Sequence, residues 1–75
     1  MSIFIRFEGA AAHEGDNGLE YTPRGPIMIN SATIVGYYDH TILTSYGSKI
    51  RVMETFEEIA QKFKGVWIRD DVHAE

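Results

Sequence analysis

Cysteine is absent from this chain, and its absence excludes two kinds of chemistry. Disulfides cannot form, and no thiol is available as a nucleophile or as a metal ligand. The three histidines, His13, His40 and His73, lack the spacing of a zinc-finger framework. We therefore expect neither a metal site nor a cofactor.

Long apolar runs are missing as well. No stretch approaches the roughly 20 apolar residues that a membrane-spanning helix needs. The opening residues MSIFIRFEG lack the basic start and long apolar core of a secretory signal. We expect a cytoplasmic protein with no membrane partner.

Basic residues are scarce, since 7 stand against 11 acidic ones and the formal net charge is −4. Binding to a nucleic-acid backbone depends on lysine and arginine that neutralise phosphates, so this balance disfavours nucleic acid as a partner. Catalytic motifs are lacking too. The histidine and acids of residues 13–16 lie in a glycine-rich segment without a nucleophile-elbow, zinc-protease or phosphate-loop pattern. We expect no catalytic residues and no enzymatic activity.

Apolar and aromatic residues, by contrast, are plentiful, at 44% and 12% of the chain. We expect residues 1–75 to form a single domain. A domain of this size buries only about 60% of the surface that its unfolded chain exposes. Without disulfides or zinc, oligomerisation is the remaining common route to stability.

The clearest local signal predicts a helix that begins after Thr55. Thr55 and Glu58 have the spacing of a capping box, in which each side chain bonds the backbone amide of the other. Gly65 is placed where a left-handed glycine would end the helix. The apolar residues in between recur at spacings of three and four, which places them on one face: Phe56, Ile59, Ala60 and Phe63.

Two strand-like runs, Thr41–Ser45 and Ser48–Met53, precede the helix and are separated by Tyr46-Gly47. A glycine between such runs is typical of a hairpin, because glycine adopts positive φ without steric cost. In the second run charged and apolar residues alternate, which places Lys49 and Arg51 on a solvent-facing side of the strand.

Further strands are predicted upstream at Ser2–Glu8, Ile27–Ile29 and Thr33–Tyr38, with turns at Asn30-Ser31 and Asp39-His40. The predicted fold class is therefore α+β: a small antiparallel sheet, built as a meander of four to six strands, with one C-terminal helix. After the helix, the alternation in Val66–Arg69 indicates a last short strand or an arm. Residues 70–75 are predicted to form a flexible acidic tail.

Residues 9–26 are unusual, because they hold four glycines and both prolines of the chain. We predict either a long loop or an extended hairpin, in which Leu19–Thr22 returns along Ala10–His13 after a turn at Asn17-Gly18. Arg24-Gly25-Pro26 would then redirect the chain. Long segments of this kind in small domains are usually functional or disordered.

About half of the chain resembles a known family. The motifs are an apolar-Asn turn, an Ile-Val strand, a Thr-rich strand, a glycine hairpin, a basic strand and an acidic helix start: Ile29-Asn30, Ile34-Val35, Thr41–Thr44, Gly47, Ile50–Val52 and Glu54–Ile59. Over roughly Ile27–Phe63 this pattern is similar to the flagellar FlbD-like family of small bacterial proteins. The resemblance implies a meander followed by a helix, and it supplies no catalytic residues. Residues 9–26 depart from the family's compact start.

Four tyrosines, four phenylalanines and a tryptophan exceed what a thin sheet-plus-helix core needs. Aromatic residues are enriched at protein interfaces. The composition therefore predicts a small interaction module that self-associates, forming a homo-oligomer, and docks on a protein partner.

Two alternatives stay open at this point. The first is a small anionic ligand such as a nucleotide, bound at a subunit interface by Arg24 in its Pro-Gly corner, with Tyr21 and Tyr38 beside a base. The second is a nucleic-acid-binding regulator that uses Arg6, Lys49 and Arg51 on the solvent-facing side of the sheet. Tyr37 or Tyr38, together with Tyr46, would stack on the bases.

Overall fold

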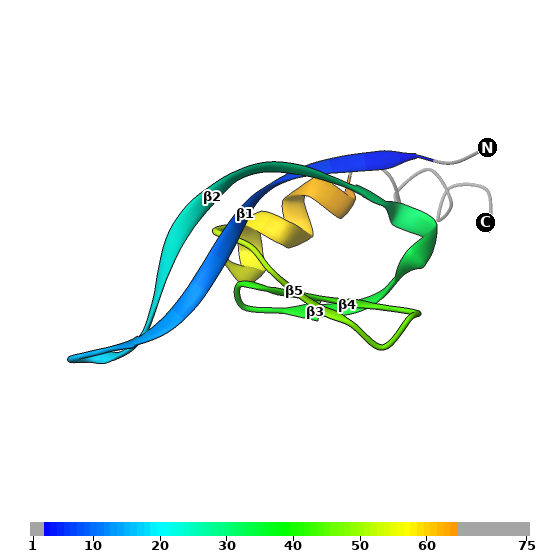
Figure 1. The fold of residues 1–75 in the computed structure, drawn as a ribbon. Helices are drawn as coiled ribbons and strands as arrows, with labels where there is room; N and C mark the ends of the chain where they lie inside the picture. The colour runs from blue at the N-terminus through cyan, green and yellow to red at the C-terminus, as the bar shows by residue number, and fades with distance from the viewer. Residues whose placement is uncertain (1–2, 65–75) are drawn as a thin grey trace.

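The structure, a computed structural model, describes residues 3–64. It consists of antiparallel strands and one C-terminal helix, which confirms the predicted α+β class (Figure 1). In chain order the elements are β1 (Phe4–Gly15), β2 (Gly18–Asn30), the 3-10 helix η1 (Ser31–Thr33), β3 (Ile34–Tyr38), β4 (Thr41–Thr44), β5 (Lys49–Arg51) and the helix of residues 56–64. The features predicted at Gly65, Val66–Arg69 and residues 70–75 lie outside the described residues.

The five strands, which we expected in one sheet, divide over two: β1–β2, and the meander β3–β4–β5. The predicted turn at Asn30-Ser31 explains the division. Asn30 caps η1 by accepting a hydrogen bond from the Ala32 amide at 3.0 Å, and η1 turns the chain out of the first sheet. An isolated bridge between Gly9 and Val52 joins the two sheets at one point.

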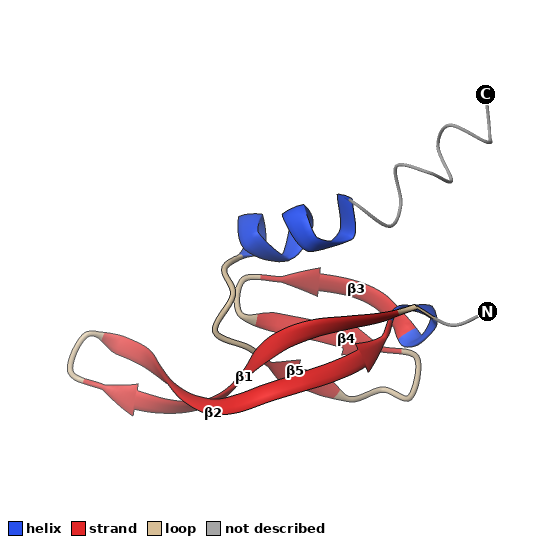
Figure 2. Ribbon diagram, turned by 90° about the horizontal axis from the view of Figure 1, so that it is seen from above, coloured by secondary structure: helices blue, strands red, loops and turns tan. Residues whose placement is uncertain are grey.

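Residues 9–26 belong to the β1–β2 hairpin and are not a loop. Pairing continues to Gly15 and Gly18, on either side of the two-residue turn Asp16-Asn17, and Gly18 has a φ of 107°, which glycine adopts without steric cost. β1 is therefore much longer than the predicted Ser2–Glu8. The distal part of the hairpin projects from the rest of the molecule as a two-stranded ribbon (Figures 1 and 2), and we call residues 10–23 the arm.

A β-bulge bends this hairpin. Gly9 pairs with Gly25 and Ala10 pairs with Pro23, so Arg24 is an extra residue on β2. Gly25 has a φ of 108°, a conformation that a residue with a side chain rarely adopts. The predicted corner at Arg24-Gly25-Pro26 is thus a bulge within a continuous strand, where twist increases and the strand changes direction.

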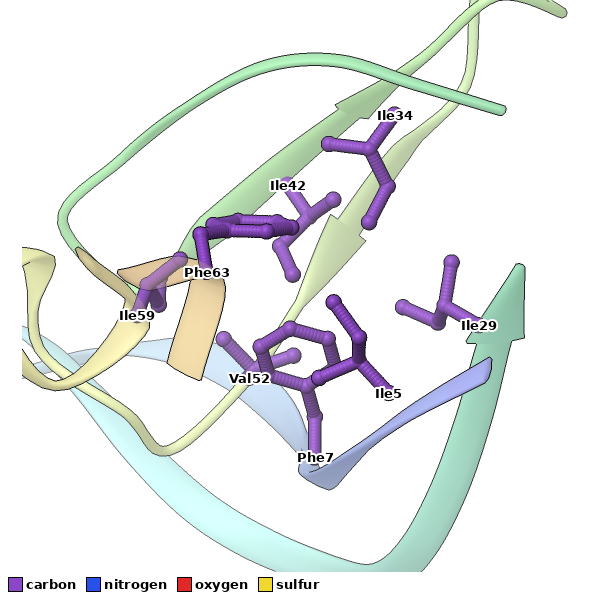
Figure 3. Packing of buried hydrophobic residues seen from close by; sticks show 8 residues of the cluster. All are labelled: Ile5, Phe7, Ile29, Ile34, Ile42, Val52, Ile59 and Phe63. Atoms are coloured by element: carbon purple, nitrogen blue, oxygen red, sulfur yellow. The ribbon is translucent and has the colours of Figure 1, made fainter. Parts of the chain in front are cut away.

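The hydrophobic core lies between the two sheets and the helix (Figure 3). The predicted capping box is confirmed, because the Glu58 amide donates to Thr55 Oγ1 at 3.3 Å and the Thr55 amide donates to Glu58 Oε1 at 3.0 Å. Both sheets contribute to the core, together with two residues of the helix: Ile5, Phe7, Ile29, Ile34, Ile42, Val52, Ile59 and Phe63.

One part of the predicted helix face was wrong. Ile59 and Phe63 are buried as expected and Ala60 is half-buried, but Phe56 is 50% exposed. Phe56 is the first helical residue, and its ring meets only the edge of the core, at 5.2 Å from the Tyr37 ring. Helical periodicity identifies a face but not how far along the helix the covering sheet extends.

The helix is fastened to β1 by two charged residues. Lys62 Nζ donates to the Arg6 carbonyl at 2.7 Å and lies 3.5 Å from Glu54 Oε2. Both oxygens of Glu54 accept from the Glu8 amide, at 3.1 and 3.2 Å. These side chains satisfy backbone groups on the edge of β1 that no strand covers.

Candidate binding surfaces

The free edge of β2 is interrupted by proline in its middle. Pro23 and Pro26 both pair with residues of β1, and a proline in a strand must lie where its missing N–H would point away from the partner strand. Backbone direction alternates along a strand, so the N–H and C=O of Met28 and of Tyr21 also point outward. The edge is therefore open to another strand at the base of the hairpin and in the arm, and closed between them.

A groove of about 390 Å³ lies beside the base of β2. None of its lining residues is charged. Two of its lining residues are isoleucines, and four bear hydroxyl groups. The lining comes from β2, η1 and the β4–β5 hairpin: Met28, Ile29, Asn30, Thr33, Thr44, Tyr46, Ser48 and Ile50.

Three large, exposed apolar side chains line this groove or lie next to a residue that lines it. Phe4 is 55% exposed, Met28 59% and Tyr46 81%. Arg6 pairs with Met28 and Phe4 pairs with Asn30, so Phe4 and Met28 are diagonal neighbours on the outer face of the hairpin. Met28 and Tyr46 both line the groove. We call Phe4, Met28 and Tyr46 the outer patch.

A second surface is the outer face of β3–β4–β5. Tyr38 pairs with Thr41 and Thr41 with Arg51, which places the three side chains in one row on the face opposite the core. Arg51 Nη1 donates to the buried Thr41 Oγ1 at 2.7 Å. Lys49 lies in the next row of the same face. We call this surface, with Tyr38, Lys49 and Arg51, the basic face.

The five residues predicted for binding do not form one site. Tyr38 and Arg51 come together on the basic face. Tyr21 reaches the adjacent turn from the arm, where its ring stacks on His40 at a centroid distance of 4.3 Å. Arg24, in the bulge of β2, and Arg6, on the outer face of β1, belong to the other sheet.

Two residues of these surfaces were missed by the sequence reasoning. His40 has a φ of 58° in the two-residue turn between β3 and β4, and its Nδ1 lies 3.2 Å from the Val52 carbonyl. The Asp39-His40 turn was visible in the sequence, but its contact with Tyr21 was not. Met28 stands between Ile27 and Ile29, and period-2 alternation indicates that the middle residue of such a run faces outward.

Comparison with known proteins finds no relative. No family model, curated protein or solved structure matches the chain. The resemblance to the flagellar FlbD-like family therefore stays a prediction.

Residues 3–64 lack two further features. No helix in that range is long and apolar enough to cross a bilayer. The same residues contain no group of three or more histidine, aspartate or glutamate side chains gathered as a metal ion would require.

Proposed function

We propose that this protein is a small, non-enzymatic interaction module that self-associates through the outer patch. The main support for the proposal is the number of large apolar side chains that are exposed, compared with the number that are buried. Among residues 3–64, eight large hydrophobic side chains are exposed, as many as the eight that form the core. Three of them lie together in the outer patch. Removing apolar surface from water is the main favourable term in most protein association.

The occupant we assign to the patch is a second copy of the chain. Met28 has an exposed apolar side chain, and its backbone N–H and C=O point outward from the free edge of β2. Within residues 3–64, no hydrogen bond joins those backbone groups to another residue. Two β2 strands related by a twofold axis can pair antiparallel at this point, because a twofold interface uses the same surface of both copies. The prolines confine the pairing to the base of the hairpin.

The size of the patch bounds the affinity. Complete burial of a large apolar side chain is worth about 1.5–3 kcal/mol, and these side chains are already partly covered. The six side chains of two patches would then supply about 6–12 kcal/mol. Lost freedom of motion on association costs about 4–15 kcal/mol. These ranges overlap, so we expect a weak dimer whose population depends on concentration.

The arm is the element we assign to a further protein partner. An isolated two-stranded hairpin is marginally stable in water. Beyond the contact between Tyr21 and His40, the arm extends away from the core (Figure 1), and Leu19 near its tip is exposed. Both strands of the arm have edges that another strand can join, apart from the position of Pro23.

Sedimentation velocity over a wide concentration range tests the self-association. The double variant Phe4→Gln/Met28→Gln removes two residues of the patch. Val35→Gln is the matched control, since Val35 is also an exposed apolar residue but lies on β3. We expect wild type and Val35→Gln to shift from monomer to dimer as concentration rises, and the double variant to stay monomeric. A monomeric wild type at every concentration would refute the proposal.

A further inference from the structure

The guanidinium of Arg51 is held in one orientation on the basic face. Its Nη1 donates to Thr41 Oγ1 at 2.7 Å, and Thr41 is completely buried. The Thr41 hydroxyl in turn donates to the Asp39 carbonyl at 3.2 Å. Within residues 3–64, no carboxylate lies within ion-pair distance of Arg51. An oriented guanidinium with spare donors is suited to bind a phosphate.

Lys49 adds a second cation to the same face. It lies two residues before Arg51 on β5, about 6–7 Å along the strand, and it is exposed. Among the described residues, Lys62 forms an ion pair with Glu54 and His40 Nε2 lies 3.8 Å from Asp39 Oδ2, and neither contact involves Lys49 or Arg51. Asp39, the acid next to this face in sequence, also accepts a hydrogen bond from the Phe56 amide at 2.7 Å. The face is thus locally cationic in a chain whose net charge is −4.

An exposed aromatic residue lies on the same face as these cations, on the opposite side of the central strand β4. Tyr38 and Arg51 lie in one row of paired residues that runs across the three strands. The next row on the same face consists of Gly36, Leu43 and Lys49. Gly36 is the residue next to Tyr38 on this face of β3. Because it has no side chain, the sheet surface is flat at that position. A Cβ at Gly36 would lie 3.5 Å from Leu43 Cδ1, which shows that Leu43 fills the floor there. A flat apolar floor next to a tyrosine is suited to a stacked base.

We infer that the basic face binds a nucleoside polyphosphate, with its phosphates on Arg51 and Lys49 and its base against Tyr38. One ring and two cations match one nucleotide. A long polyanion is disfavoured, because the net charge of −4 repels phosphates that extend beyond this face. The inference does not rest on self-association, since the outer patch is centred on the β1–β2 sheet.

A calorimetric titration of the full chain with ATP tests the inference. We expect saturable binding that weakens about tenfold in Tyr38→Leu and about tenfold in Lys49→Gln and Arg51→Lys. Arg6→Gln is the matched control, because it removes the same charge from the other sheet, and its affinity should stay within about twofold of wild type. Tripolyphosphate and adenosine should each bind more weakly than ATP.

Several outcomes would overturn the inference. One is the absence of saturable ATP binding up to millimolar concentration. A loss in Arg6→Gln equal to that in Lys49→Gln would show delocalised attraction instead of a site. Equal affinity for tripolyphosphate and ATP would rule out a role for the base, and tighter binding of a single-stranded oligonucleotide would make nucleic acid the ligand. If Arg51→Lys fails to fold, Lys49→Gln preserves the test, because Lys49 makes no side-chain hydrogen bond or ion pair recorded within residues 3–64.

Discussion

Replacing Phe63 by alanine should lower the stability of this fold by a large amount. Phe63 is 1% exposed and joins the helix to both sheets. Its ring lies 6.2 Å from that of Phe7 on β1 and 5.1 Å from that of Tyr37 on β3. The variant would leave a cavity where the three layers meet, because the backbone around a buried site collapses only partly.

The expected loss can be compared with the whole stability of the chain. Truncation of a buried phenylalanine to alanine costs about 3–5 kcal/mol, including the cavity. A domain of 75 residues has a total stability of about 4–11 kcal/mol. Phe63→Ala should therefore lose at least about a quarter of the total stability, and all of it if the wild type lies at the low end of the range. Phe63→Leu retains part of the volume and should cost about 1–2 kcal/mol, which keeps the loss measurable.

Urea denaturation followed by far-UV circular dichroism measures both variants. Phe56→Ala is the matched control, because it makes the same substitution in the same helix at a side chain that is 50% exposed. It should cost about 1 kcal/mol, roughly half the value of a fully buried ring. If Phe63→Ala and Phe56→Ala lower the free energy of unfolding equally, the packing of the helix described here is wrong.

Three further predictions concern the arm and the attachment of the helix. Deleting residues 11–14 together with 19–22 removes four rungs of the hairpin, an even number that preserves the alternation of pairs; the shortened protein should fold and dimerise as before, and loss of dimerisation in sedimentation would contradict the assignment of the patch. His40→Ala removes the surface on which Tyr21 stacks, so amide exchange in the arm should accelerate while core amides stay protected; unchanged exchange in the arm would show that the stacking does not hold it. Lys62→Met keeps the apolar stem but loses the bond to β1, and should lower the free energy of unfolding by about 1–3 kcal/mol in urea denaturation; a variant as stable as wild type would show that this bond contributes nothing.

The parts of the fold that follow from local chemistry were predictable from the sequence. Thr55 and Glu58 cap the helix through bonds within one turn, so four residues of sequence suffice to predict them. The arm was ambiguous because its glycines and prolines are typical of loops. Pro23 and Pro26 are compatible with a strand only on a free edge, and sequence does not show which edge is free.

The candidate surfaces were predictable only in part, for the same reason. Alternation along β5 indicated that Arg51 faces solvent, and pairing places Tyr38 in its row. The approach of Tyr21 to His40 depends on the bulge at Arg24, which bends a strand that runs far beyond the core. Contacts of this kind join residues distant in sequence, so no local pattern predicts them.

Hydrogen exchange at single amides, measured by NMR at low and high protein concentration, tests the proposed self-association. In the proposed dimer two copies pair at the base of β2, where the Met28 N–H faces outward. The Met28 amide should exchange more slowly as concentration rises, because the dimer supplies its hydrogen-bond acceptor. The Leu19 amide, which also faces outward but lies in the arm, should keep its rate. A Met28 amide that exchanges at one rate at every concentration would contradict the proposed self-association.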